Sequence, residues 1–160
     1  MTATTAVHSI LVPIDLSAGT SRILKFAAAI ARSFHGNICL LHCIEQERDT
    51  VCELGIRPVS MYEFSEHHSK EFQQLTEEAA SLESDGFDVQ LDIVQGPVAE
   101  AILATAQQNQ IDLIVIGSQG HDAVWDHEVG SITEEVLSQA DIPVLVVPTV
   151  TKKPAQRCLV

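Results

Sequence analysis

Short apolar runs alternate along the chain with stretches in which apolar residues recur at helical spacing. The apolar runs cover residues 8–14, 37–44, 87–94, 112–117 and 143–148, and each has the length of a strand. Helical spacing appears from Ile23 to Phe34, over 63–84, after Gly96-Pro97 and over 131–140. This alternating order predicts an α/β fold of three layers, in which helices cover both faces of a doubly wound, five-stranded parallel sheet.

Three stretches depart from this pattern. Residues 45–62 have no clear period and predict a long connection, whereas 87–94 alternate strictly between apolar and polar residues. Such alternation leaves one face of a strand in water and is typical of an edge strand. The polar residues from Thr149 onward predict a frayed end. We therefore expect one domain over residues 1–150 and a tail over 151–160.

Composition and charge narrow the possible functions. The 160 residues are 46% hydrophobic but only 4% aromatic, so the core must be aliphatic. The formal net charge of −13 would repel nucleic acids and anionic membranes, although a small anionic ligand could still bind at a local dipole. The four cysteines, Cys39, Cys43, Cys52 and Cys158, form no C-x-x-C pair, and no targeting segment precedes the first strand. These features predict reduced cysteines and a cytoplasmic protein.

A glycine-rich loop follows the fourth predicted strand and leads into the last helix. It contains Gly117 and Gly120, and after nine further residues Gly130 and Ser131. Backbone amides at the start of a helix suit a phosphate group, and we expect those near Gly130 to be unpaired, with hydroxyl donors added by Ser131 and Thr133. The P-loop and dinucleotide-binding motifs are both absent. The loop is also compatible with a purely structural strand-to-helix turn.

Asp15 follows the first strand directly after Pro13 and Ile14. If the first and fourth strands are neighbours, its carboxylate faces the same crevice as Gly117, because ligands of such sheets bind beyond the carboxyl ends of the strands. There it could accept hydrogen bonds from an adenine amine or from ribose hydroxyls. The alternative is that Asp15 only stabilises the start of the next helix.

The segments 10–17, 40–43, 112–117 and 143–148, with the spacing G-2x-G-9x-G-[ST] from Gly117 to Ser131, resemble the universal stress protein family over residues 7–148. The resemblance implies strand order 3-2-1-4-5, as in adenine nucleotide alpha hydrolase-like folds, and homodimers paired along the fifth strand. It also implies an adenine nucleotide, ATP, ADP or AMP, as ligand. The residues that it places around this ligand are Pro13, Ile14, Asp15, Cys43, Ile116, Gly117, Gln119, Gly120, Gly130, Ser131, Ile132 and Thr133.

The chain departs from the family in the charge of its loop. Gln119 stands where the family usually has Arg or His, and the loop contains Asp122, Asp126 and Glu128 but no Lys or Arg. Three outcomes are compatible with this charge. A divalent cation, Mg²⁺ or Mn²⁺, bridges the loop and the phosphates; the site prefers AMP or ADP; or the site has lost its nucleotide. His121 and His127 with Asp122 and Asp126 form no recognisable metal-binding pattern, and Trp125 is either a lid or a partner contact.

No nucleophile and base can be paired in the sequence, and no nucleophile elbow is present. We therefore expect no dedicated enzyme and at most slow ATP hydrolysis. The first functional hypothesis is an adenine-nucleotide-binding module that acts as a stress-response sensor or regulator. The alternative is a nucleotide-independent interaction protein that binds an unidentified protein partner and has a degenerate site.

Overall fold

The computed structural model describes residues 6–45, 55–120 and 129–149. Its elements are, in chain order, β1 (Ser9–Pro13), α1 (Thr20–Phe34), β2 (Asn37–Ile44), β3 (Arg57–Pro58), α2 (Met61–His67), α3 (Ser69–Ser84), β4 (Val89–Gln95), α4 (Val98–Gln108), β5 (Leu113–Gly117), α5 (Ser131–Gln139) and β6 (Val144–Val147). No helix in these described ranges is both long and apolar enough to cross a lipid bilayer.

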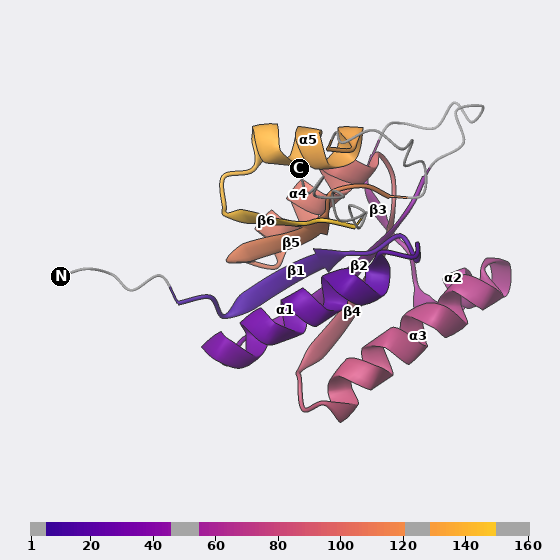
Figure 1. The fold of residues 1–160 in the computed structure, drawn as a ribbon. Helices are drawn as coiled ribbons and strands as arrows, with labels where there is room; N and C mark the ends of the chain where they lie inside the picture. Colours follow the sequence, from indigo (N-terminus) through magenta and orange to yellow (C-terminus); the bar gives the residue numbers. More distant parts are fainter. Residues whose placement is uncertain (1–5, 46–54, 121–128, 150–160) are drawn as a thin grey trace, which may run out of the picture.

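The strands form one sheet in the order β3-β4-β2-β1-β5-β6 (Figure 1). All pairs are parallel except β3 with β4. The five parallel strands reproduce the predicted order 3-2-1-4-5, so the α/β doubly wound fold is confirmed. Because β1 pairs with both β2 and β5, the winding direction reverses at β1, which is where such sheets open a crevice at their carboxyl ends.

Two apolar cores lie on opposite faces of this sheet. Helices α1, α2 and α3 cover one face, where Ile10, Leu40 and Leu75 are fully buried. Helices α4 and α5 cover the other, where Leu11, Ile114 and Val136 are fully buried. Neighbouring residues of β1 therefore point into different cores, and its apolar run is continuous because both of its faces are buried.

The segment 45–62, expected to be a connection only, contains regular structure at its described end. The two residues of β3 pair antiparallel with Val94 and Gln95, and Ser60 then starts α2 by accepting a hydrogen bond from the Glu63 amide at 3.1 Å. The pair Ser60 and Glu63 has the spacing of a capping box, which marks the start of a helix. This local signal was overlooked because apolar residues show no regular spacing in the segment. The strand β4 is thus an edge strand over most of its length, and β3 lies beside only its carboxyl end.

The single helix predicted over 63–84 is in fact two helices. His68 separates α2 from α3 with φ −134° and ψ 52°, and its ring stacks on Phe64 at 4.9 Å between ring centroids. No glycine or proline marks this break in the sequence. The packing of His68 on the buried Phe64 accompanies the break, and apolar spacing along the chain could not reveal it.

Candidate functional site

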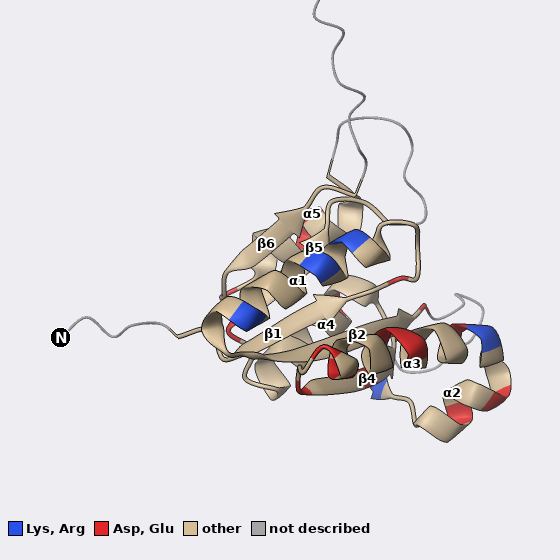
Figure 2. Ribbon diagram, turned by 60° about the horizontal axis from the view of Figure 1, so that its bottom comes forward, with Lys and Arg blue, Asp and Glu red and all other residues tan. Residues whose placement is uncertain are grey.

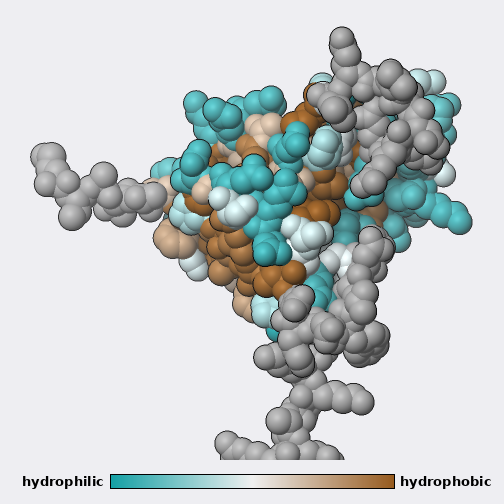
Figure 3. All heavy atoms as spheres, turned by 90° about the horizontal axis from the view of Figure 1, so that it is seen from above, coloured by the Kyte–Doolittle hydropathy of each residue, from teal (hydrophilic) through white to brown (hydrophobic). Residues whose placement is uncertain are grey.

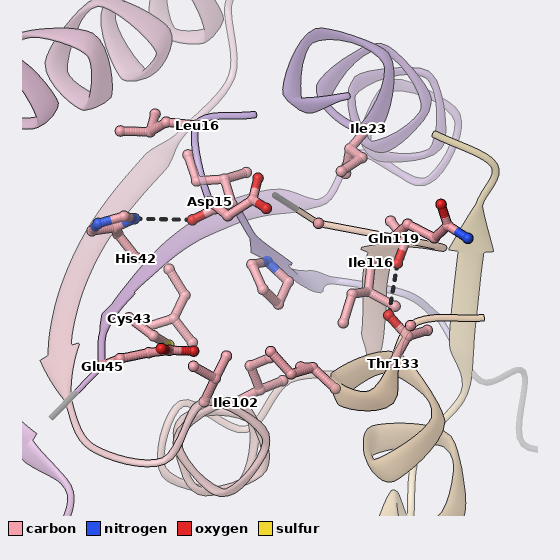
Figure 4. Close-up of a pocket in the computed structure, with 18 of the residues that line it drawn as sticks. Asp15, Leu16, Ile23, His42, Cys43, Glu45, Ile102, Ile116, Gln119 and Thr133 are labelled. Atoms are coloured by element: carbon pink, nitrogen blue, oxygen red, sulfur yellow. Dashed lines mark hydrogen bonds between the residues drawn. The ribbon is translucent and has the colours of Figure 1, made fainter. Parts of the chain in front are cut away.

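A cavity of about 870 Å³ opens at the carboxyl ends of β1, β2 and β5 (Figure 4). Its size is typical of small-molecule sites. Apolar side chains line it from the sheet and from α4, including Ile14, Ile102 and Ile116. The structure brings all twelve sequence-predicted site residues together around it, namely Pro13, Ile14, Asp15, Cys43, Ile116, Gly117, Gln119, Gly120, Gly130, Ser131, Ile132 and Thr133. Their role in binding remains a prediction.

We call the side formed by Gly117, Gly120, Gly130, Ser131 and Thr133 the α5 end of the cavity. Lack of space, and not an unusual backbone conformation, requires glycine at positions 117 and 120, since none of the three glycines at this end has a positive φ. A Cβ at Gly117 would lie 2.7 Å from Thr149 Cγ2 and 2.8 Å from Ile23 Cδ1. A Cβ at Gly120 would lie 2.6 Å from Asp15 Oδ2. These close approaches explain the motif more directly than chain flexibility does.

The structure corrects the expected set of hydrogen-bond donors at this end. The Gly130 amide donates to the Ser118 carbonyl at 2.7 Å and is not unpaired. The buried Thr133 hydroxyl donates to the Gly117 carbonyl at 2.8 Å and so has no proton left for a ligand. Within the described residues, the amides of Ser131, Ile132 and Thr133 meet no acceptor, because α5 begins there without a side-chain cap. These amides carry the positive end of the helix dipole.

Thr149 holds the start of the glycine-rich loop in place. Its amide donates to Ser118 Oγ at 3.1 Å, and its hydroxyl lies within hydrogen-bond distance of the amide and the carbonyl of Gln119. The expectation that the chain frays from Thr149 is therefore wrong for this residue. The polar side chain that suggested fraying instead pairs with backbone groups of the loop, and the residues after it lie outside the described ranges.

Asp15 stands on the opposite side of the crevice from α5. It follows β1, and its Oδ1 accepts a hydrogen bond from the Ser17 amide at 3.0 Å, which orients the carboxylate. Its other oxygen approaches Gly120, so the predicted juxtaposition of Asp15 with the glycine-rich loop is present. Leu16, next in the chain, has φ 61°, a conformation that is uncommon for leucine. Strain of this kind persists where surrounding structure holds it.

Sequence reasoning missed the other side of the cavity, which we call the α3 end. It is formed by His42 and Glu45 from the carboxyl end of β2 and by His68, Glu71 and Gln74 from the helical region. His42 Nδ1 lies 3.0 Å from the Ile14 carbonyl oxygen, so β2 is tied to the segment that carries Asp15 (Figure 4). The His42 ring meets Phe64 edge to face at 5.6 Å, and His68 stacks on the same Phe64.

The environment of His42 favours its neutral form. Burial lowers the pKa of His42 below its usual value, against the opposing effects of the hydrogen bond to Ile14 and of the charges of Glu71 and Asp15. Because a carbonyl can only accept, the neutral ring must carry its proton on Nδ1. His42 thus supports the loop that carries Asp15 as an uncharged donor.

The two described cysteines are not reactive groups. Burial raises the pKa of the Cys43 thiol to about 12, and burial together with the charge of Asp92 raises that of Cys39 to about 12. Thiols in such environments stay protonated and are poor nucleophiles. Cys43 therefore borders the cavity as an apolar group, in keeping with its expected position beside a ligand.

Carboxylates are the only fully charged groups that line the cavity within the described residues. They are Asp15, Glu45 and Glu71, and neither Lys nor Arg joins them. No cluster of three or more metal-binding side chains occurs in that same part of the chain. The loop residues His121, Asp122, Trp125, Asp126, His127 and Glu128 lie outside the described ranges.

The α3 end gave only a weak signal in the sequence. His42 sits inside an apolar run, where an isolated polar residue at the carboxyl end of a strand points to a crevice. His68, Glu71 and Gln74 look like the solvated face of a helix, and only tertiary packing brings them to the cavity.

Comparison with known proteins identifies relatives of the whole domain. The sequence model of the universal stress protein family matches residues 6–148. Universal stress protein MJ0577 from Methanocaldococcus jannaschii is 31% identical over 150 residues, covering 86% of this chain and 93% of that protein. Its solved structure superposes with a TM-score of 0.68 at 30% identity, over 92% of this chain and 99% of that one.

Two more distant structures share the fold. One is a universal stress protein in complex with cAMP, with a TM-score of 0.65 and 20% identity over 91% of this chain and 99% of that one. The other is a universal stress protein from Archaeoglobus fulgidus in complex with dAMP, with a TM-score of 0.61 and 18% identity over 88% and 98% of the two chains.

Proposed function

Since the chain belongs to the universal stress protein family, we propose that its cavity binds an adenine nucleotide and that the protein acts as a stress-response sensor or regulator. The observation that carries this proposal is the placement of Asp15 across one cavity from the α5 amides, which meet no acceptor among the described residues. A carboxylate can accept from ribose hydroxyls or the adenine amine, whereas helix amides suit a phosphate.

The apolar lining fits the remaining part of such a ligand. Ile14, Ile102 and Ile116 offer apolar side chains against which a planar base could pack. Related proteins hold cAMP and dAMP, two ligands that combine an adenine base with a single phosphate. For this chain, we propose that Pro13, Ile14, Asp15 and Cys43 border the base and ribose, and that the α5 end with Ile132 and Gln119 holds the phosphate.

A divalent cation, Mg²⁺ or Mn²⁺, is compatible with the donor set only as a partner of the nucleotide. Such ions are usually held by one or two carboxylates together with substrate phosphates, and Asp15 offers one carboxylate at the cavity. Sensing would then consist of a change in the loop or in the oligomer between the occupied and empty forms. Rapid catalysis is not part of the proposal, because no activated nucleophile lines the described cavity wall.

Equilibrium binding to nucleotide-stripped protein tests the proposal. We expect saturable binding of labelled AMP or ATP to the wild-type protein at one site per chain. Gly120→Val should abolish this binding, because its side chain would displace the Asp15 carboxylate and enter the cavity. The fold should survive, since only the end of the Asp15 side chain must move. Ala29→Val, which adds similar bulk on the exposed face of α1, is the matched control. Equal binding by both variants would contradict the proposal.

We also propose a homodimer paired along β6. This strand is the last of the sheet, and no described strand pairs with its outer edge. Leu145 of β6 is 37% exposed on this strand, and Leu137 of α5 is 45% exposed. Figure 3 shows hydrophobic surface on the face seen from above. Sedimentation should show a dimer that Leu145→Lys converts to a monomer. A wild-type monomer at micromolar concentration would contradict this assignment.

The same exposed surface supports the second candidate function, a nucleotide-independent interaction protein. The two functions are separated by the binding measurement. Failure of every adenine nucleotide to bind, with or without Mg²⁺, favours the second, whereas loss of binding only in Gly120→Val favours the first.

A further inference from the structure

Resting on the proposed function, we infer that the cavity selects adenine ligands by phosphate number, accepting adenosine and AMP without a metal ion and rejecting ADP and ATP until a divalent cation is supplied. Sequence alone left three possibilities open at this point. The charges and donors of the described wall favour a combination of the first two, a preference for few phosphates and a divalent cation for the longer ligands.

The first observation is the charge of the wall. Asp15, Glu45 and Glu71 line the cavity, whereas the cations of the described residues lie elsewhere. Arg22, Lys25 and Arg32 are on the exposed side of α1, Arg57 is on β3, and Lys70 is on α3 (Figure 2). Each phosphate beyond the first therefore gives the ligand further negative charge, which the carboxylates of the wall repel.

The second observation is the small number of donors at the α5 end. The amide of Gly130 and the hydroxyl of Thr133 are used within the protein. Within the described residues, the amides of Gly120, Ser131, Ile132 and Thr133 and the Ser131 hydroxyl remain, a set of donors that the oxygens of a single phosphate group can use. A helix start carries roughly half a positive charge, enough to favour one phosphate but not to neutralise three.

The third observation is the position of Asp15. Its carboxylate is oriented by the Ser17 amide at 3.0 Å and reaches across the crevice toward Gly120 of the α5 end. A polyphosphate that extends from the α5 amides toward Gly120 comes close to this carboxylate. A divalent cation between the two would remove the repulsion, because a carboxylate and phosphate oxygens are ligands that Mg²⁺ prefers.

The test is calorimetric titration of nucleotide-stripped, full-length protein with adenosine, AMP, ADP and ATP, first in EDTA and then in Mg²⁺, at constant ionic strength. In EDTA we expect affinity to fall by about tenfold or more for each phosphate after the first. Mg²⁺ should restore much of the ATP affinity and leave adenosine unchanged. ATP binding in EDTA as tight as that of AMP would overturn the inference, whatever the source of the compensating charge.

Two variants test whether positive charge in the cavity wall strengthens ATP binding. Gln119→Arg and Val129→Arg each place a cation in the cavity wall. Each should strengthen ATP binding in EDTA by about tenfold. In Val129→Arg, which changes none of the residues proposed to hold the nucleotide, adenosine affinity should stay constant and so report an intact fold and site. Gln108→Arg makes the same charge change at the exposed end of α4, away from the cavity, and should leave the order of affinities unaltered. Equal ATP gains in all three variants would contradict a local effect.

Failure of the inference and failure of the proposed function give different results. If the four ligands bind with equal affinity, or if ATP binds best in EDTA, the inference is wrong and nucleotide binding stands. If none of the four binds in either buffer, the proposed function is wrong and the inference fails with it.

Discussion

The α5 end and the α3 end of the cavity are built on different physical principles. At the α5 end, glycines make room for neighbouring atoms, and backbone amides and carbonyls provide most of the polar groups. At the α3 end, side chains do this work, as His42 and His68 both pack on the buried Phe64 and Glu71 faces the cavity from a separate helix. A backbone site tolerates few added atoms, whereas a side-chain site depends on the protonation and packing of individual residues.

The largest effect is expected from crowding the α5 end. Gly117→Val should lower the free energy of unfolding by about 3 kcal/mol, because even its Cβ would press on Thr149 and Ile23 in a buried environment. Gly130→Ala should change it by less than about 1 kcal/mol, since φ is −62° and the Cβ would meet Ser118 O at 3.3 Å. Urea denaturation of both variants measures the difference. Similar losses of unfolding free energy in the two variants would mean that the room around each glycine does not determine the effect of substitution.

The next effect comes from the hydrogen bond that ties α5 to β5. Thr133→Val keeps the shape of the side chain but removes the donor to the Gly117 carbonyl, leaving a buried acceptor unpaired. We expect a loss of about 1–3 kcal/mol in unfolding free energy. Thr76→Val on α3 is the control, because its hydroxyl bonds only to carbonyls within its own helix. An equal loss in the control would show that the effect is one of helix propensity.

A smaller, pH-dependent effect is expected at the α3 end. Since burial lowers the pKa of His42 in the folded protein, the unfolded chain binds the proton more readily. The stability that His42 contributes is therefore complete above about pH 6.5, the usual histidine value, and decreases as the pH falls toward its folded-state pKa. His42→Phe should remove this dependence and also the bond to Ile14.

Thermal unfolding of the wild-type protein, His42→Phe and the exposed-site control His67→Phe between pH 5 and pH 8 tests that expectation. The wild-type advantage over His42→Phe should shrink as the pH is lowered, whereas His67→Phe should follow the wild type. A wild-type advantage that grows on acidification would mean that His42 is stabilised in its charged form.

The smallest effect is expected from the ion pair of Arg57 with Glu63, whose atoms are 2.9 Å apart. The pair raises the pKa of Arg57 and lowers that of Glu63, yet both side chains are exposed. Exposed pairs contribute little because water screens them. Arg57→Ala should leave the unfolding midpoint and nucleotide binding unchanged. A clear loss of nucleotide binding would show that the Arg57–Glu63 pair helps to hold the α3 end of the cavity in place.

The difference between the two ends also explains what the sequence could predict. The α5 end is formed by one continuous segment that leaves a strand and enters a helix, so the sequence spacing of Gly117, Gly120, Gly130 and Ser131 is enough to predict it. The α3 end is assembled from β2, from the break at His68 and from α3, and no spacing along the chain links them. The hydrogen bonds of Gly130 and Thr133 were misjudged for the same reason, since their acceptors, the carbonyls of Ser118 and Gly117, precede the helix by more than ten residues.

The fold itself was largely predictable because each buried strand is a continuous apolar run and each helix has a regular stripe. The sheet order followed from family resemblance, since apolar period does not record which strands are neighbours. The short β3 and the split of α2 from α3 were missed because two exposed strand residues carry no period and because His68 breaks the helix without glycine or proline.

The central claim is that an adenine nucleotide binds between Asp15 and the start of α5, and a titration of ¹⁵N-labelled protein with AMP followed by amide chemical shifts tests it most directly. The amides of Ser131, Ile132 and Thr133, together with those of Asp15 and Gly120, should shift in a saturable manner. Those around Gly86, at the opposite end of the sheet, should not. Saturation without shifts at Asp15 and α5, or no change on adding AMP, would contradict the account.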